Sequence, residues 1–227
     1  AFLPETHKDS LSDRRAEILT NTKQAIRDSE LNPVISSEFF SSIPAELMHQ
    51  MCVELSEYGE VELVYFVRNQ INLMAANYMQ QVKRHQLTSL PVEYYKNWDS
   101  FKHTLDYCGR LNNIKNHCTN AIVHVDAYEN SKNHQDGILG LLFDTLGVKV
   151  PTERFVPDTP INLSPSPQEL RLLIEVNRHS PRMQFSDIIV EGSARVGRSK
   201  VHASHDILPP TLRREIFEYF ALGNEKL

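Results

Sequence analysis

The sequence predicts an α/β protein built on a parallel sheet, and two observations carry that prediction. Residues Val61–Val67 form an apolar run broken only by Glu62 and without clean alternation, which is typical of a strand buried on both faces. Apolar residues at helical spacing follow at once, from Ile71 to Val82. A strand-then-helix order recurs on both sides of this stretch, which favours a parallel sheet with right-handed crossovers.

The composition is that of a soluble globular domain, with 227 residues of which 41% are hydrophobic and 23% charged. The net charge of -5 excludes a global basic field, so we expect no nucleic-acid partner. No apolar run approaches the roughly 20 residues of a transmembrane helix. The three cysteines contain no CxxC pair and predict neither a disulfide framework nor a zinc site, which fits a cytoplasmic protein. Cys52 falls on an apolar helical stripe and is predicted to be a core residue.

Upstream of Val61 the patterns predict two helices and a short strand. The elements are a surface helix at Leu11–Asp28, a strand at Val34–Ser37 that ends at Glu38, and a helix opened by Pro44 with Leu47, Met48, Met51, Cys52 and Leu55 inward. Tyr58-Gly59 is expected to stop this last helix.

Downstream of Arg84 the patterns predict a loop, then further helices and one strand. In order, they are a loop with a little helix at Leu87–Ser100, a helix at Ser100–His117, a strand at Ala121–Val125, a helix at Ile138–Leu146 closed by Gly147, a surface connection at Pro151–Pro167, a short helix at Glu169–Asn177, mostly loop at Ser180–Ala203 and a last helix from Pro210 to Gly223.

Motifs for metal and nucleotide sites are scarce. The sequence contains no HExxH, GxSxG, GxxxxGK[ST] or GxGxxG pattern. His202 and His205, beside Asp206, are too few to predict a metal site, because such sites need three or four convergent ligands. We therefore predict no metal.

Two charged residues follow predicted strands, Glu38 after the first and Arg68 after the second. If those strands are parallel neighbours, both side chains face the crevice where α/β proteins bind ligands. Arg68 would hold a phosphate and Glu38 would take a proton from an acceptor hydroxyl. The plainer alternatives stay open: Arg68 paired with a carboxylate, and Glu38 as a capping or salt-bridging residue.

Several segments in order resemble the bacterial sulfotransferase-like proteins of the P-loop superfamily, from about residue 34 to the end of the chain. They are Ile35–Phe40, Val64–Gln70 with Tyr78, Gln80, Gln81 and Lys83 behind it, Leu105–Tyr107, Asp126–Glu129, Phe143–Gly147, Asn162–Ser166, Val176–Arg178, and Leu208–Arg214 with Asn224. The order and spacing of these segments carry the resemblance.

The resemblance implies a three-layer α/β/α fold with a central parallel sheet and a helix-rich C-terminal half. It also implies transfer of a sulfuryl group from 3′-phosphoadenosine 5′-phosphosulfate (PAPS) to a hydroxyl or amine of a glycan, lipid or small molecule, without a metal. By position, Arg68 and the adjacent Asn69 would bind the donor's 3′-phosphate and Glu38 would be the catalytic base. The serine that usually joins the arginine is Ala76 here.

The resemblance further implies that residues 1–227 form a single domain without the family's first strand and 5′-phosphosulfate loop. We therefore expect these residues alone to show no turnover. Two alternatives remain: a binding or scaffold module that kept the fold and lost catalysis, and a nucleotide-dependent kinase of the P-loop class. Leu87–Ser100 and Ser180–Ser204 are the segments expected to contact an acceptor, such as a polysaccharide.

Overall fold

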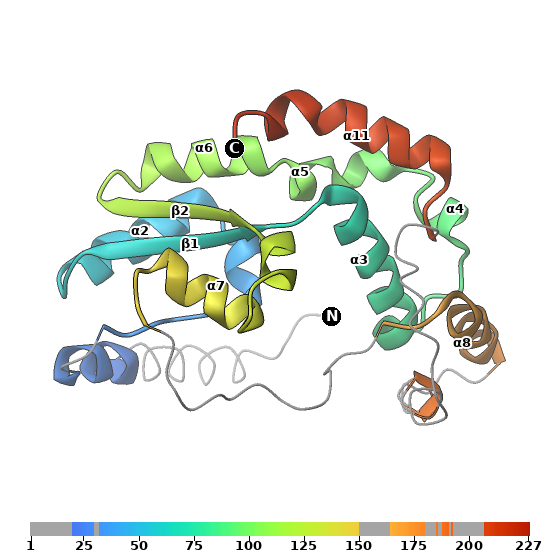
Figure 1. Ribbon diagram of the computed structural model, residues 1–227, viewed down its shortest axis with the longest axis horizontal. Coiled ribbons are helices and arrows are strands. Elements are labelled where there is room, and N and C mark those ends of the chain that lie inside the picture. Colours follow the sequence, from blue (N-terminus) through green and yellow to red (C-terminus); the bar gives the residue numbers. More distant parts are fainter. Residues whose placement is uncertain are drawn as a thin grey trace, which may run out of the picture. The chain divides into compact units, whose positions relative to one another are not determined.

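The computed structural model describes residues 20–29, 32–149, 164–179, 185, 188–190, 192 and 207–227 (Figure 1). These residues form a helix-rich α/β structure with a parallel sheet of two strands, β1 (Val61–Val67) and β2 (Ala121–Ala127). The predicted α/β class and the strands at Val61 and Ala121 are confirmed. No helix in the described ranges is both long and apolar enough to cross a membrane.

Helices precede, connect and follow the two strands along the chain. Residues 20–28 are helical, and the later elements are η1 (Glu38–Ser42), α2 (Ala45–Ser56), α3 (Gln70–His85), α4 (Pro91–Tyr94), η2 (Trp98–Phe101), α5 (Lys102–Leu105), α6 (Tyr107–His117), η3 (Tyr128–Lys132), α7 (Gly137–Thr145), α8 (Pro167–His179) and α11 (Pro210–Asn224). The predicted helices after Pro44, Arg68, Ile138, Glu169 and Pro210 are confirmed within a few residues.

The chain divides into two compact units, one of residues 1–62 with 114–122 and one of residues 63–113 with 123–227. In the first unit α2 buries one face, which includes Met48 and Cys52. An ion pair of 2.6 Å between Lys23 Nζ and Glu54 Oε2 ties residues 20–28 to that helix.

In the second unit α3 is the central element, because both α8 and α11 pack against it (Figure 1). Its buried face includes Ala75 and Tyr78, which are fully buried. Among the described residues, the core around it includes Met74, Ala75, Tyr78, Met79, Val82, Tyr95, Trp98, Leu105, Leu170, Leu173, Ile174, Val190, Leu208, Leu212, Ile216 and Phe220. Burial of these side chains is the main source of stability in this unit.

A capping box fixes the start of α8. Ser166 Oγ accepts a hydrogen bond of 3.3 Å from the Glu169 amide, and Glu169 Oε2 accepts one of 2.6 Å from the Ser166 amide. Pro167 stands at the first helical position, where its missing N–H costs nothing. The four residues Ser-Pro-Gln-Glu thus set the boundary of α8 locally, two residues earlier than predicted.

The predicted strand at Val34–Ser37 is wrong. Residues 32–37 lie in neither helix nor strand, and Glu38 begins the 3-10 helix η1 instead of ending a strand. The side chains of Val34 and Ile35 are 62% and 43% exposed. Without a partner strand to satisfy the backbone and bury these side chains, β-branched residues do not make a strand by propensity alone.

The predicted helix at Ser100–His117 is broken at Asp106, which has φ -79° and ψ 77°. Asp106 Oδ1 accepts a hydrogen bond of 2.9 Å from the Gly109 amide, so it caps α6 in the manner of an N-terminal aspartate. A side chain at position 109 would collide with this carboxylate, because a Cβ there would lie 2.3 Å from Asp106 Oδ2. The capping interaction therefore restarts the helix and separates α5 from α6.

Other predictions fall wholly or partly outside the described ranges. These are the first half of the helix at Leu11–Asp28, the connection Pro151–Pro167 up to residue 163, and much of Ser180–Ala203. Within the last segment, residues 185, 188–190 and 192 are helical, so the prediction of a loop does not hold for them. Val190, which is 1% exposed, explains the difference because it belongs to the core around α3.

Candidate functional site

The candidate site lies where β1 passes into α3, within the second compact unit. β1 ends at Val67, Arg68 follows, and Asn69 caps the helix that begins at Gln70. Asn69 Oδ1 accepts a hydrogen bond of 3.1 Å from the Asn72 amide. Only one residue therefore separates the end of the strand from the cap, which puts Arg68 directly beside the N-terminus of a 16-residue helix. Such an N-terminus carries a partial positive charge.

Arg68 has an aromatic neighbour and no acidic partner. Its guanidinium carbon lies 5.2 Å from the ring centroid of Tyr128, a cation–π distance. The side chain is half-buried, and no carboxylate within the described part of the chain forms an ion pair with it. The described residues therefore do not show Arg68 as a surface arginine paired with a carboxylate. The forked N–H groups stay available to an anion.

The end of β2 supplies the other side of the site. Asp126 Oδ1 accepts hydrogen bonds from the Ala127 amide at 2.7 Å and from Asn130 Nδ2 at 2.6 Å, which shapes the turn into η3. Glu129 then reaches across to the first strand's end, where its Oε1 accepts a hydrogen bond of 3.1 Å from the Asn69 amide. This bond joins two turns that are 60 residues apart.

The Glu129 carboxylate gives the site mixed charge. It accepts a hydrogen bond from the Asn69 amide at the start of α3, while the Asn69 side chain accepts one from the Asn72 amide. Anions are stabilised at helix N-termini, and here a protein carboxylate already uses part of that field. An incoming anion would depend mainly on Arg68 and would meet repulsion from Glu129.

Tyr107, the first residue of α6, closes the site from a third segment. Burial raises the pKa of its hydroxyl, and the nearby Glu129 carboxylate raises it further. A backbone hydrogen bond from Arg68 and the positive charge of that residue act in the opposite direction. Burial prevails, so Tyr107 stays a neutral hydroxyl at physiological pH.

A reciprocal amide pair supports the site from behind. Gln70 Nε2 donates to Asn224 Oδ1 at 2.8 Å, and Asn224 Nδ2 donates to Gln70 Oε1 at 3.2 Å. Gln70 is only 6% exposed. The pair therefore fixes the last residue of α11 to the first residue of α3, immediately after the arginine and the cap.

The predicted site residues belong to different elements. Arg68 and Asn69 stand together at the β1–α3 junction, as their sequence positions require. Ala76 lies six residues into α3, about 9 Å along the axis from Gln70, and packs against the core. Glu38 belongs to the other compact unit, and its backbone starts η1.

Sequence reasoning gave no role to Glu129, Tyr128, Tyr107 or the Gln70–Asn224 pair, although the quoted segments included them all. A signal existed for the first two, since polar and aromatic residues directly follow the strand Ala121–Val125 at the edge expected to bind ligands. No local pattern pairs Gln70 with Asn224, 154 residues away.

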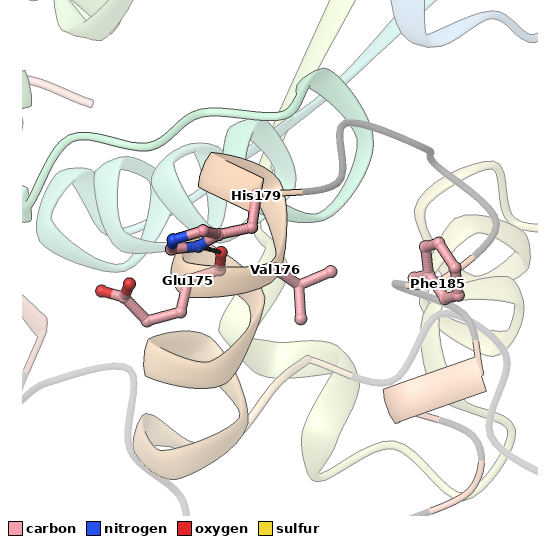
Figure 2. A pocket seen from close by; sticks show the side chains of 4 residues that line it. All are labelled: Glu175, Val176, His179 and Phe185. Carbon is pink, nitrogen blue, oxygen red and sulfur yellow. Dashed lines mark hydrogen bonds between the residues drawn. The ribbon is translucent and has the colours of Figure 1, made fainter.

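Two hollows elsewhere are poor candidates. The larger, of about 380 Å³, is lined by Glu175, Val176 and His179 of α8 and by Phe185, which lies on the Val176 side (Figure 2). Its polar groups are already paired, because Glu175 Oε1 binds Arg178 Nη1 at 2.6 Å and His179 Nδ1 bonds the Glu175 carbonyl at 3.0 Å. The second, of about 260 Å³, lies over the start of α11 and includes Pro210 and Glu218.

No metal-binding group of three or more His, Cys, Asp or Glu side chains occurs among the residues that the structure describes. His202, His205 and Asp206 lie outside those residues. The side chains at the β1–α3 junction are therefore the main candidates for ligand binding, and Arg68 is the one among them that suits an anionic group.

Comparisons with known proteins add no assignment. No protein-family model matches the chain, and no curated protein or solved structure matches it either.

Proposed function

We propose that this protein is a sulfotransferase-like enzyme of the three-layer P-loop class, which binds PAPS and transfers its sulfuryl group to a hydroxyl or amine of a glycan, lipid or small molecule. The observation that carries the proposal is Arg68, a half-buried arginine at the carboxyl end of β1 without an acidic partner in the described ranges. The resemblance of the surrounding segments to that family supports it.

In this proposal Arg68 binds the donor's 3′-phosphate. A guanidinium can make two parallel hydrogen bonds to phosphate oxygens, and the Tyr128 ring restricts the directions in which its plane can turn. The start of α3 adds a favourable field, and Asn69 holds that start in place. The site would thereby recognise the phosphate that distinguishes PAPS from ordinary adenine nucleotides.

The chemical step assigned by the resemblance is an in-line displacement without a metal. The acceptor oxygen or nitrogen attacks sulfur and forms the new bond, while the bond from sulfur to the 5′-phosphate oxygen breaks. Glu38 takes the acceptor's proton, and adenosine 3′,5′-bisphosphate leaves. Positioning and charge stabilisation supply most of the catalysis in such group transfers.

A second candidate is a binding module on the same fold without catalysis. Two observations favour it: Ala76 offers no hydroxyl, and the Glu129 carboxylate already holds the Asn69 amide. Both weaken an anion site. In this alternative Glu38→Gln leaves the function unchanged, whereas in a catalytically active form of the enzyme it abolishes transfer. The acceptor class and a cytoplasmic location remain predictions.

The test is calorimetric titration with adenosine 3′,5′-bisphosphate, with 5′-AMP as the matched control that lacks only the 3′-phosphate. We expect the bisphosphate to bind at least about tenfold tighter than 5′-AMP, because one charge-assisted contact contributes about 1.5–3 kcal/mol. Equal affinities, or tighter binding of ATP than of the bisphosphate, would contradict a PAPS site and favour the scaffold or kinase alternative.

A further inference from the structure

The first compact unit contains two buried thiols in contact with each other, Cys52 on α2 and Cys118 directly after α6. They are sixty-six residues apart in the sequence, and each is 1% exposed. The two thiol groups lie within hydrogen-bonding contact of each other. Neither thiol is part of the β1–α3 junction, so the pair has no role in the proposed function.

The backbone around the pair is held in place on both sides. The Cys118 amide donates to the Ile114 carbonyl at 2.7 Å, and the Ala121 amide donates to the Cys118 carbonyl at 3.1 Å, which forms the turn that leads into β2. From that turn Asn120 Nδ2 donates to the Cys52 carbonyl at 3.4 Å. The turn is therefore tied to α2 at the residue that carries the other thiol.

We propose that Cys52 and Cys118 form an intramolecular disulfide when the protein meets a peroxide, which would cross-link α2 to the turn before β2. One thiolate attacks a peroxide oxygen and becomes a sulfenic acid, and the first water leaves. The second thiol attacks the sulfenic sulfur, the S–S bond forms, and the hydroxyl leaves as a second water. The two thiols thus lose two protons and two electrons, and one hydrogen peroxide becomes two waters.

The environment makes this reaction slow. Burial raises the pKa of the Cys52 thiol to about 12, and the neighbouring Cys118 contributes to the rise. A thiol that stays protonated reacts slowly, so the pair would respond to prolonged rather than brief exposure to peroxide. In a reducing compartment the two thiols would stay reduced, as they are in the structure.

The test uses the full chain with Cys108→Ser, which removes the more accessible third thiol and leaves the buried pair untouched. Reduced protein is exposed to hydrogen peroxide under native conditions and then denatured in the presence of N-ethylmaleimide, which labels free thiols. Its mass is measured by mass spectrometry. We expect a monomer that is lighter by two hydrogen atoms and carries no maleimide. Peptide mapping should recover a fragment that joins Cys52 to Cys118.

Two further readouts complete the test. The oxidised form should melt about 5–10 °C above its reduced form, because the cross-link closes a long loop in the unfolded chain. The matched Cys108→Ser, Cys118→Ala chain should show neither the mass loss nor the shift. Two free thiols after oxidation, sulfinic acids in place of the disulfide, or only intermolecular cross-links would overturn the proposal.

Discussion

The two ends of α3 differ in how their polar groups are satisfied, although the same core lies between them. At the C-terminal end Asn177 of α8 donates to the Val82 carbonyl at 2.8 Å and to the Leu87 carbonyl at 3.2 Å. Arg178 adds a bond of 3.1 Å to the Thr88 carbonyl. At the N-terminal end the Arg68 guanidinium has an aromatic neighbour and no ion pair in the described part of the chain.

This difference suggests different roles for the two ends of α3. Carbonyl groups left over at the end of a helix cost free energy when they are buried, and α8 supplies their donors. The half-buried Arg68 guanidinium has the Tyr128 ring beside it but no ion pair in the described ranges, so an anionic ligand would be stabilised there. The C-terminal end therefore contributes to stability, and we propose that the N-terminal end binds the ligand.

The largest expected effect concerns Asn177, which is 8% exposed. Asn177→Leu keeps the side-chain volume close but leaves two carbonyl groups without their donor. We expect the free energy of unfolding to fall by about 2–4 kcal/mol, since each buried unsatisfied group costs about 1–3 kcal/mol. Urea unfolding measures the change, with the exposed Arg171→Ala as the control. A loss of unfolding free energy as small as that of the control would show that the Asn177 hydrogen bonds do not stabilise the C-terminal end of α3.

The next effect concerns Tyr78, whose hydroxyl donates to the Ser89 carbonyl at 2.8 Å. Burial raises its pKa from 10.0 to about 12. Between pH 10 and pH 12 the unfolded chain therefore loses this proton and the folded chain keeps it, so stability is complete below about pH 10 and falls as the pH rises.

Tyr78→Phe removes that titrating group and should flatten the fall by up to about 1.4 kcal/mol per pH unit. Unfolding free energies measured across that alkaline window for both proteins provide the test. Parallel curves for the variant and the unmodified chain would show that Tyr78 does not keep its proton in the fold.

A smaller effect is expected for Gln70, whose amide pairs with that of Asn224. Gln70→Leu should lower the free energy of unfolding by about 1–2 kcal/mol, because the partner amide stays partly buried without its bonds. The same variant should weaken binding of adenosine 3′,5′-bisphosphate only slightly, because the pair supports the junction and does not face the ligand. A larger loss of affinity than of stability would place Gln70 in the site itself.

The smallest effect concerns Glu129 and sharpens the N-terminal half of the comparison. Glu129→Gln keeps an oxygen to accept the bond from the Asn69 amide and removes the negative charge. We expect the affinity for the bisphosphate to rise about two- to fivefold, a change of under about 1 kcal/mol, which is typical of a charge at a helix end. Unchanged affinity in low salt would mean that the anion binds away from the start of α3.

The strand β1, the helix α3 and the position of Arg68 between them could be predicted because each follows from local sequence. The apolar run, the helical spacing and the polar residues that end the strand all lie within twenty-five residues of one another. The start of α8 could also have been predicted, because the capping box of Ser166 and Glu169 is a local sequence pattern.

Most of the features that the sequence did not predict depend on partners far along the chain. Val34 and Ile35 have strand-forming side chains but no neighbouring strand, so they remain exposed. The break at Asp106 shows the opposite case, in which one capping carboxylate outweighs apolar helical spacing. The Glu129–Asn69 bond links turns that only the fold brings together, and no pattern in a single sequence announces it.

The measurement that tests the account most directly is the affinity of Arg68→Ala and of Arg171→Ala for adenosine 3′,5′-bisphosphate, beside the stability of both. The control removes an arginine from the exposed face of α8. We predict that Arg68→Ala weakens binding by about 10- to 150-fold, equivalent to about 1.5–3 kcal/mol, and leaves stability within about 0.5 kcal/mol. Equal affinities for the two variants would show that the N-terminal end of α3 is not the donor site.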